Sequence, residues 1–157
     1  MAEFHPELRR AAGMIPRFAF TPTLARFARF LQRLRGVPKP PRPEGLSVRD
    51  VVIPASGDRP DLRVRVYAPD TVAAPRPAML WIHGGGFIIG TPEQDEANII
   101  ALCRELDMAV VAVAYRLGPD HPHPAALHDC YAALEWLHGH AGILGVDAGR
   151  IAIGGNS

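Results

Sequence analysis

The sequence predicts an α/β fold built on a mostly parallel central sheet with helices on both faces. Two short runs, residues 78–82 and 109–114, are almost wholly apolar, as expected of strands that helices cover on both sides. Segments with helical spacing lie at 96–106 and 125–138. Because strands and helices alternate along the chain, we expect parallel strands joined by right-handed crossovers.

Composition and charge limit the classes of function. The chain has 157 residues, 48% of them hydrophobic and 21% charged, which suits one globular domain with a core. The formal charge of +1 lacks the basic excess of nucleic-acid binders. No run approaches the roughly 20 apolar residues of a membrane span, and Cys103 and Cys130 are too few for a disulfide framework. We expect a cytoplasmic protein with a small-molecule partner.

The N-terminal region differs in pattern from the rest. From Thr23 to Leu34 apolar residues recur at helical spacing with arginines between them, which predicts an amphipathic helix. We expect its apolar stripe to pack onto the protein's own domain, although its basic face is also typical of helices on anionic lipid and of transit peptides. Prolines between residues 36 and 45 then predict an extended connector. The stripe consists of Leu24, Phe27, Phe30, Leu31 and Leu34.

The body of the fold begins with two further strands. Residues 48–54 and 62–69 flank a turn-rich segment at 56–60, and residues 62–67 alternate between apolar and polar. This pattern predicts an antiparallel pair at one edge of the sheet. The last strand is expected at 151–153, and it is as apolar as the interior strands.

A glycine-rich segment follows the first interior strand directly. In this glycine loop (residues 83–86, HGGG), Gly84, Gly85 and Gly86 leave their N–H groups unobstructed by Cβ atoms, which suits an oxyanion hole. A plain glycine-rich turn is the alternative. A phosphate loop is disfavoured because Ile89 stands where a dinucleotide fingerprint needs its third glycine, and no Gly-Lys-Ser/Thr follows.

The last strand runs into Gly155, Asn156 and Ser157, which match the first half of a nucleophile elbow. A lone Gly-x-Ser is weak evidence for a nucleophile, since both residues are common in turns. Chain order strengthens it, because the serine follows the strand that comes two crossovers after the glycine loop, as in α/β-hydrolases.

On these motifs the chain resembles the hormone-sensitive-lipase-like family of α/β-hydrolases, whose commonest members are carboxylesterases. The resemblance runs from about residue 48 to 157. It includes the glycine loop, YRLGPD at 115–120, PAA at 124–126, Asp129 and DAGRIA at 147–152.

The resemblance implies an α/β-hydrolase fold and a serine hydrolase that acts on short-chain carboxylic esters. Ser157 would be the nucleophile, and amides of Gly84, Gly85 and Gly86 would form the oxyanion hole with the amide after the serine. His83 would orient the loop and would not be the general base. Residues 1–45 would form an N-terminal helical cap segment and proline-rich connector, and residues 46–157 the N-terminal half of the catalytic domain. No cofactor or metal is implied, and a homodimer is compatible with the family.

The chain departs from the family pattern at several points. Asn156 occupies the position where aspartate is usual, and Gly118 and Asp120 replace alanine and glutamate. The acid and the histidine of a triad follow the serine in this fold, so both are expected beyond Ser157. Ending at 157 is expected to leave an apolar strand edge, and hence aggregation or an obligate partner chain.

Two other functional readings stay open at this stage. The first is a non-catalytic small-molecule-binding protein on the same fold, as in the gibberellin receptors that resemble this family. The second is an inactive fragment that needs a partner chain.

A metal site is the alternative interpretation of the histidines around residues 121–140, where His121, His123 and His128 cluster. Prolines at 122 and 124 favour a surface loop, and neither H-E-x-x-H nor a paired cysteine motif is present. Arg116 and Asp129 are expected to pair between this loop and the following helix.

Overall fold

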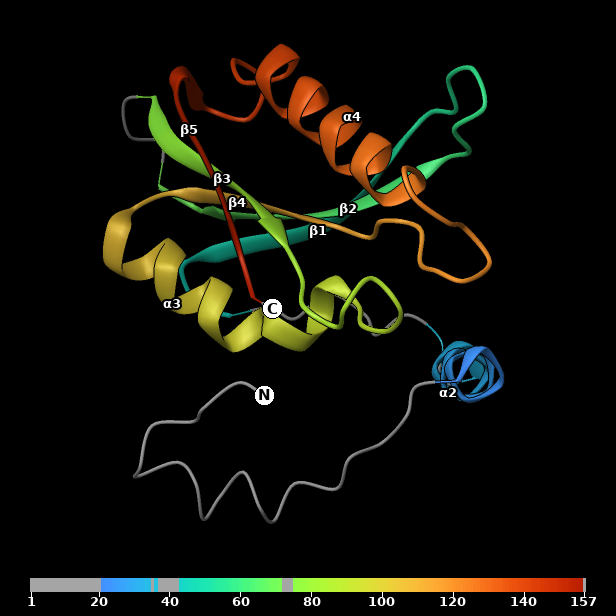
Figure 1. The fold of residues 1–157 in the computed structure, drawn as a ribbon. Coiled ribbons are helices and arrows are strands. Elements are labelled where there is room, and N and C mark those ends of the chain that lie inside the picture. The colour runs from blue at the N-terminus through green and yellow to red at the C-terminus, as the bar shows by residue number, and fades with distance from the viewer. Residues whose placement is uncertain (1–20, 35, 37–42, 72–74, 157) are drawn as a thin grey trace, which may run out of the picture.

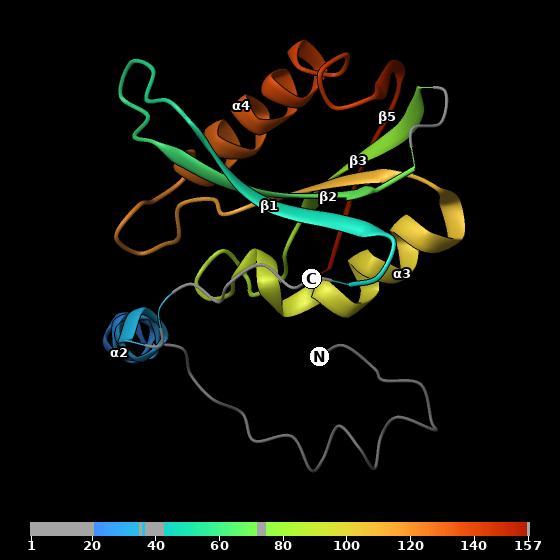
Figure 2. The same cartoon turned by 180° about the vertical axis from the view of Figure 1, so that it is seen from behind.

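The computed structural model describes residues 21–34, 36, 43–71 and 75–156. Their five strands form one sheet in the order β1-β2-β4-β3-β5, in which β3, β4 and β5 run parallel and β2 is antiparallel to both of its neighbours. Helix α4 covers one face of the sheet and α3 the other (Figures 1 and 2). The expected α/β architecture is therefore confirmed. The strands are β1 (Leu46–Ile53), β2 (Leu62–Pro69), β3 (Arg76–Ile82), β4 (Ala109–Val113) and β5 (Val146–Gly155), and the helices are α2 (Pro22–Leu34), η2 (Pro92–Asp95), α3 (Glu96–Leu106) and α4 (Ala125–Gly139).

The apolar run of β4 is explained by two separate cores. Val111 and its neighbours two residues away pack with α4, whereas Val110 and Ala112 pack with Ile99 and Cys103 of α3. All five residues of β4 are at most 1% exposed. Because both faces of β4 are covered by apolar cores, apolar side chains are favoured at every position, and the apolar–polar alternation of a half-exposed strand is absent.

Strand β5 is longer than the sequence predicts. It begins at Val146, which pairs with Arg76, and a register irregularity between Arg76 and Ala78 precedes its regular pairing with β3. Among the described residues β5 is the outermost strand on its side, and Ile153 is 59% exposed.

Helix α2 forms as expected, but the prediction that its apolar stripe packs onto the rest of the domain is wrong. The five residues of the apolar stripe are 42–68% exposed among the described residues, whereas Ala25 and Arg29 are buried. Arg29 donates to the Leu117 carbonyl at 3.0 Å and also bonds the carboxylate of Asp120. The buried side of α2 is therefore the one that carries Ala25 and Arg29, and Arg29 joins it to the loop after β4.

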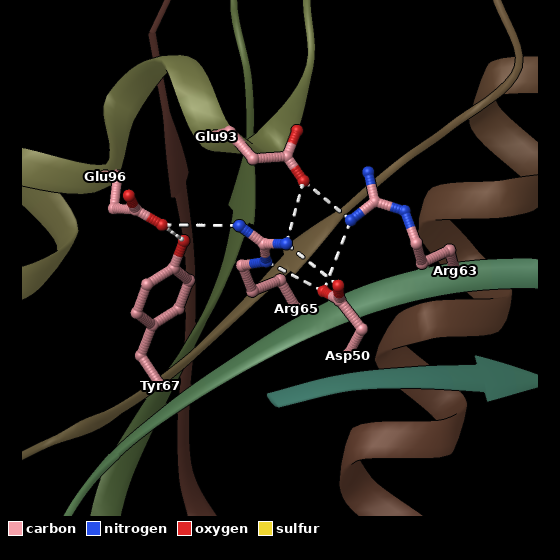
Figure 3. Close-up of polar contacts among 6 residues, drawn as sticks. All are labelled: Asp50, Arg63, Arg65, Tyr67, Glu93 and Glu96. Atoms are coloured by element: carbon pink, nitrogen blue, oxygen red, sulfur yellow. Dashed lines mark hydrogen bonds and ion pairs between the residues drawn. The ribbon is translucent and has the colours of Figure 1, made fainter. Parts of the chain in front are cut away.

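The apolar–polar alternation of β2 does not place its polar side chains in solvent. Arg65 and Tyr67 are both 0% exposed, because η2 and the start of α3 lie over this face of the strand. Figure 3 shows the cluster that makes this burial tolerable. The Arg65 guanidinium donates to both carboxylate oxygens of Asp50, at 2.7 and 2.8 Å.

The same cluster joins β2 to the helical segments. Arg63 donates to Glu93 of η2 at 2.6 Å, and Arg65 lies 3.4 Å from Glu96 of α3, which also accepts a hydrogen bond from the Tyr67 hydroxyl at 2.9 Å. The hydrogen bond from Arg65 lowers the pKa of Asp50. Two guanidinium groups thus hold three carboxylates, and η2 is fixed over the sheet.

Removing one guanidinium tests this arrangement. In the intact protein we expect Arg65→Met to lower the free energy of unfolding by about 3 kcal/mol, because Glu96 would lose its cation and Asp50 and Glu93 would share Arg63 alone. Urea denaturation monitored by circular dichroism measures the change. The matched control is Arg49→Met on the exposed side of β1, with an expected change of at most about 0.5 kcal/mol. Equal midpoints for the two variants would contradict this account.

Candidate active site

The glycine loop lies at the carboxyl end of β3 and folds back tightly on itself. The carbonyl of Gly85 accepts hydrogen bonds from the amides of Ile88 and Ile89, at 3.1 and 3.2 Å. Gly85 has φ +125° and Gly86 has φ +61°, and a Cβ atom on Gly85 would stand 2.0 Å from the Ile89 carbonyl oxygen. Only glycine fits at Gly85, for reasons of both φ and space.

The end of β5 lies directly beside this loop. Gly155 is paired with Ile82, so closely that a Cβ on Gly155 would meet the Ile82 carbonyl oxygen at 2.0 Å. The amide of Asn156 then bonds the same carbonyl at 3.3 Å. The structure thus brings Asn156 and the glycine loop together at the carboxyl ends of two parallel strands, where α/β proteins bind ligands. Ser157 lies outside the described residues.

His83 is a buried packing residue. It is 3% exposed, its ring stacks on Tyr115 at 4.2 Å, and its Nδ1 atom lies 2.9 Å from the Gly84 carbonyl oxygen. Because a carbonyl only accepts, Nδ1 carries the proton in that contact. Burial lowers the pKa of His83, and the Tyr115 hydroxyl donates to the His83 carbonyl at 2.6 Å. A neutral, enclosed imidazole of this kind supports the loop and is not poised to exchange protons with a substrate.

The short helix η2 contributes two site residues that sequence reasoning missed. Gln94 donates to the Gly84 carbonyl at 3.2 Å. Asp95 accepts from the Trp81 indole at 2.9 Å and from the Asn156 side chain at 2.8 Å. The sequence contained one indication of such a residue, because the indole N–H of Trp81 in a buried strand needs a hydrogen-bond acceptor. Nothing in the sequence indicated which acceptor it would be.

Gly90 is a further residue that the motifs did not single out. Its φ is +113°, and a Cβ there would meet the Gly84 carbonyl oxygen at 2.5 Å and His83 Nδ1 at 2.6 Å. The chain that enters η2 therefore has to pass close against the glycine loop. Glycine is required here for the same reason as at Gly85.

The predicted pairing of Arg116 with Asp129 is confirmed. Arg116 bonds both oxygens of the carboxylate through Nε and Nη2 at 2.9–3.1 Å, and its backbone amide donates to Asp129 at 2.8 Å. Asp129 is 1% exposed, so this pair anchors the loop after β4 to α4. The same loop contacts the glycine loop region, because the amide of Gly118 donates to the Phe87 carbonyl at 2.8 Å.

An apolar cavity of about 450 Å³ opens beside Gly86. The thiol of Cys130 lies in its wall, but burial raises the pKa of that thiol to about 11, so it is a packing group and not a reactive one. A larger hollow of about 650 Å³ between the β1–β2 turn and α4 is more polar and does not border the glycine loop. The cavity wall beside Gly86 includes Ile82, Phe87, Ile88, Ala126 and Leu127.

His121 and His123 are exposed on the loop before α4, as expected of a surface loop, and His128 is exposed on α4 itself. Within the described ranges, no three His, Cys, Asp or Glu side chains gather closely enough to hold a metal ion. None of the helices in the described part of the chain is both long and apolar enough to cross a bilayer.

A sheet with a glycine loop after β3 and a Gly-Asn-Ser sequence at the end of β5 defines a protein of the α/β-hydrolase class. Comparison with known families agrees, because the profile of the alpha/beta hydrolase fold matches residues 79–157. The chain belongs to this family, in its hormone-sensitive-lipase-like branch.

Individual relatives point the same way. The sequence is 39% identical over 128 residues to Esterase LipI of Mycobacterium tuberculosis, covering 80% of this chain and 39% of that protein. It is 39% identical over 113 residues to Carboxylic ester hydrolase LipN of the same organism, covering 71% of this chain and 29% of LipN. The chain therefore spans well under half the length of these relatives.

Solved structures are also similar. A bacterial heroin esterase superposes with a TM-score of 0.75 at 40% identity, over 98% of this chain and 48% of that one. EstE1, a thermostable carboxylesterase cloned from a metagenomic library, gives a TM-score of 0.69 at 42% identity, over 88% of this chain and 46% of that one.

The burial of His83 leads us to predict how the free energy of unfolding depends on pH. Its folded-state pKa lies below the usual 6.5, so the unfolded chain binds a proton that the folded protein does not. The free energy of unfolding should therefore fall as the pH drops below about 6.5, by at most about 1.4 kcal/mol per pH unit from this residue. Urea unfolding at pH 7.5 and 5.5 should reveal a smaller loss for His83→Asn than for the wild type. Equal losses would refute the assignment of a buried neutral His83.

Proposed function

We propose that this chain supplies the nucleophile and the oxyanion hole of a serine carboxylic-ester hydrolase. The single observation that carries the proposal is the pairing of Gly155 with Ile82, which brings the residue before Ser157 beside the glycine loop. The esterase and lipase names of the relatives support the same chemistry.

The proposed reaction begins with attack of the Ser157 hydroxyl on the acyl carbonyl. The general base takes the hydroxyl proton as the Ser157–acyl bond forms, the carbonyl oxygen becomes negative, and amides of the glycine loop donate to it. The ester C–O bond then breaks and the alcohol leaves with a proton from the general base. Water hydrolyses the acyl-enzyme to release the carboxylic acid and the free serine.

The general base is not assigned to any histidine of residues 1–157. His83 is enclosed by Tyr115 and the glycine loop, and α/β-hydrolases take the acid and the histidine from positions after the serine. We propose that this family order holds here, so that the activity needs the C-terminal half of the fold.

The domain arrangement is part of the proposal. Residues 1–45 would be an N-terminal helical cap segment with its connector, and residues 46–157 the N-terminal half of the catalytic domain. The contacts of Arg29 with Leu117 and Asp120 support this, because the same loop touches Phe87 next to the glycine loop. A cytoplasmic location is supported by the free, buried thiols of Cys103 and Cys130.

Acylation of the serine can be tested directly. In the intact protein we expect Ser157→Ala to lower kcat for p-nitrophenyl acetate by about a thousandfold or more, because the nucleophile is lost. Mass spectrometry after treatment with a phosphonate ester should find the adduct on Ser157 of the wild type. Gly85→Ala is the companion variant: its new Cβ would displace the loop, so kcat should fall while Ser157 stays reactive. Hydrolysis that survives Ser157→Ala would sink the proposal, and a folded wild type without hydrolysis would favour a binding protein.

Short acyl chains are the proposed substrates. A cavity of about 450 Å³ is at the lower end of small-molecule sites, and the acyl group has to share it with part of the alcohol. We expect kcat/KM for p-nitrophenyl butyrate to exceed that for the palmitate ester by at least about tenfold. Assays on monomeric esters below their aggregation limit provide the comparison. Equal values for the two esters would contradict the preference.

A further inference from the structure

Asp95 is a buried carboxylate that the proposed reaction does not use. It is 8% exposed and ends η2, immediately before α3. Each of its oxygens accepts one hydrogen bond: Oδ2 from the Trp81 indole at 2.9 Å and Oδ1 from the Asn156 amide group at 2.8 Å. Two donors thus meet two acceptors, so both oxygens of the buried Asp95 carboxylate are satisfied, while Asn156 itself is exposed.

The donors come from two neighbouring strands. Trp81 belongs to β3, just before the glycine loop, and Asn156 follows β5, just before Ser157. Asn156 is held twice, because its backbone amide also bonds the Ile82 carbonyl at 3.3 Å. Its side chain is therefore a second tether on the backbone that leads into the serine.

The helix that carries Asp95 is itself fixed. Gln94, the preceding residue, donates to the Gly84 carbonyl, and Glu93 accepts from the Arg63 guanidinium at 2.6 Å. The glycine loop and the residue before the serine are consequently tied to adjacent residues of one short helix. A shift of η2 would move both together.

We propose that Asp95 and Asn156 are a matched pair of positioning residues that sets Ser157 against the glycine loop. The pair works because one member only accepts hydrogen bonds and the other donates. This inference rests on the proposed ester hydrolysis at Ser157.

The pair also explains why asparagine stands at 156, where aspartate is usual in the family. An aspartate at 156 would have no hydrogen to donate, and its carboxylate would face that of Asp95 at hydrogen-bonding distance. The two positions are therefore coupled. An aspartate at 156 becomes acceptable only if position 95 offers a donor.

A double-mutant cycle in the intact protein tests the coupling. We expect N156D to lower kcat for p-nitrophenyl acetate by about 10- to 100-fold with little change in KM, because the serine is displaced while the binding pocket stays. D95N should cost less, since an asparagine at 95 still accepts from Trp81. The double variant D95N/N156D should recover to within about threefold of the wild type, because the donor and the acceptor have exchanged places.

The matched control is Asn98→Asp, the same chemical change at an exposed position of α3, which should leave kcat unchanged. Circular dichroism and melting temperature report whether each variant is folded. A folded N156D with wild-type kcat would overturn the pairing, and so would a double variant no better than N156D. If N156D does not fold, recovery of folding and activity in the double variant still supports the pair. A wild type that neither hydrolyses esters nor reacts with the phosphonate would instead refute the proposed function itself.

Discussion

The arrangement of the candidate site depends on the burial of the Arg65 guanidinium between β2 and the start of the helical segment above it. A buried cation is tolerated only when carboxylates surround it closely. Asp50, Glu93 and Glu96 provide them from β1, η2 and α3. Because these partners come from three elements, the ion pairs of Arg65 also hold η2 over the sheet, and η2 contacts both the glycine loop and the residue after β5.

Three glycines allow the backbone segments of the candidate site to pack closely together. Gly85, Gly90 and Gly155 each lie where a Cβ would come within 2.5 Å of a backbone carbonyl oxygen. Close backbone contact of this kind leaves little room for larger side chains, so the loop, η2 and the strand end form one closely packed unit. Tyr115 closes the unit from the side of the 115–120 segment by stacking on His83.

The sequence predicted the elements well because their burial is visible in local patterns. The bounds of α3 agree with the expected 96–106, and the wholly apolar run at β4 is buried on both faces. Prediction failed where a side chain's partner lies far away along the chain. The burial of Arg65, the outward stripe of α2 and the contact of Asp95 with Asn156 all depend on tertiary neighbours, and alternation or helical spacing carries no information on those.

The Asp95–Asn156 pair also limits the negative charge near the proposed oxyanion. A tetrahedral intermediate is negative, so a carboxylate close to it raises its free energy, and a second carboxylate would raise it further. With asparagine at 156 and a neutral His83, Asp95 is the one carboxylate in this hydrogen-bonded group, and its two oxygens are engaged by Trp81 and Asn156. Exchanging the two residues would keep this single negative charge but move it from η2 to the residue beside Ser157. Any activity that the exchanged pair fails to recover would then measure the effect of where the charge lies, separately from the hydrogen bond between positions 95 and 156.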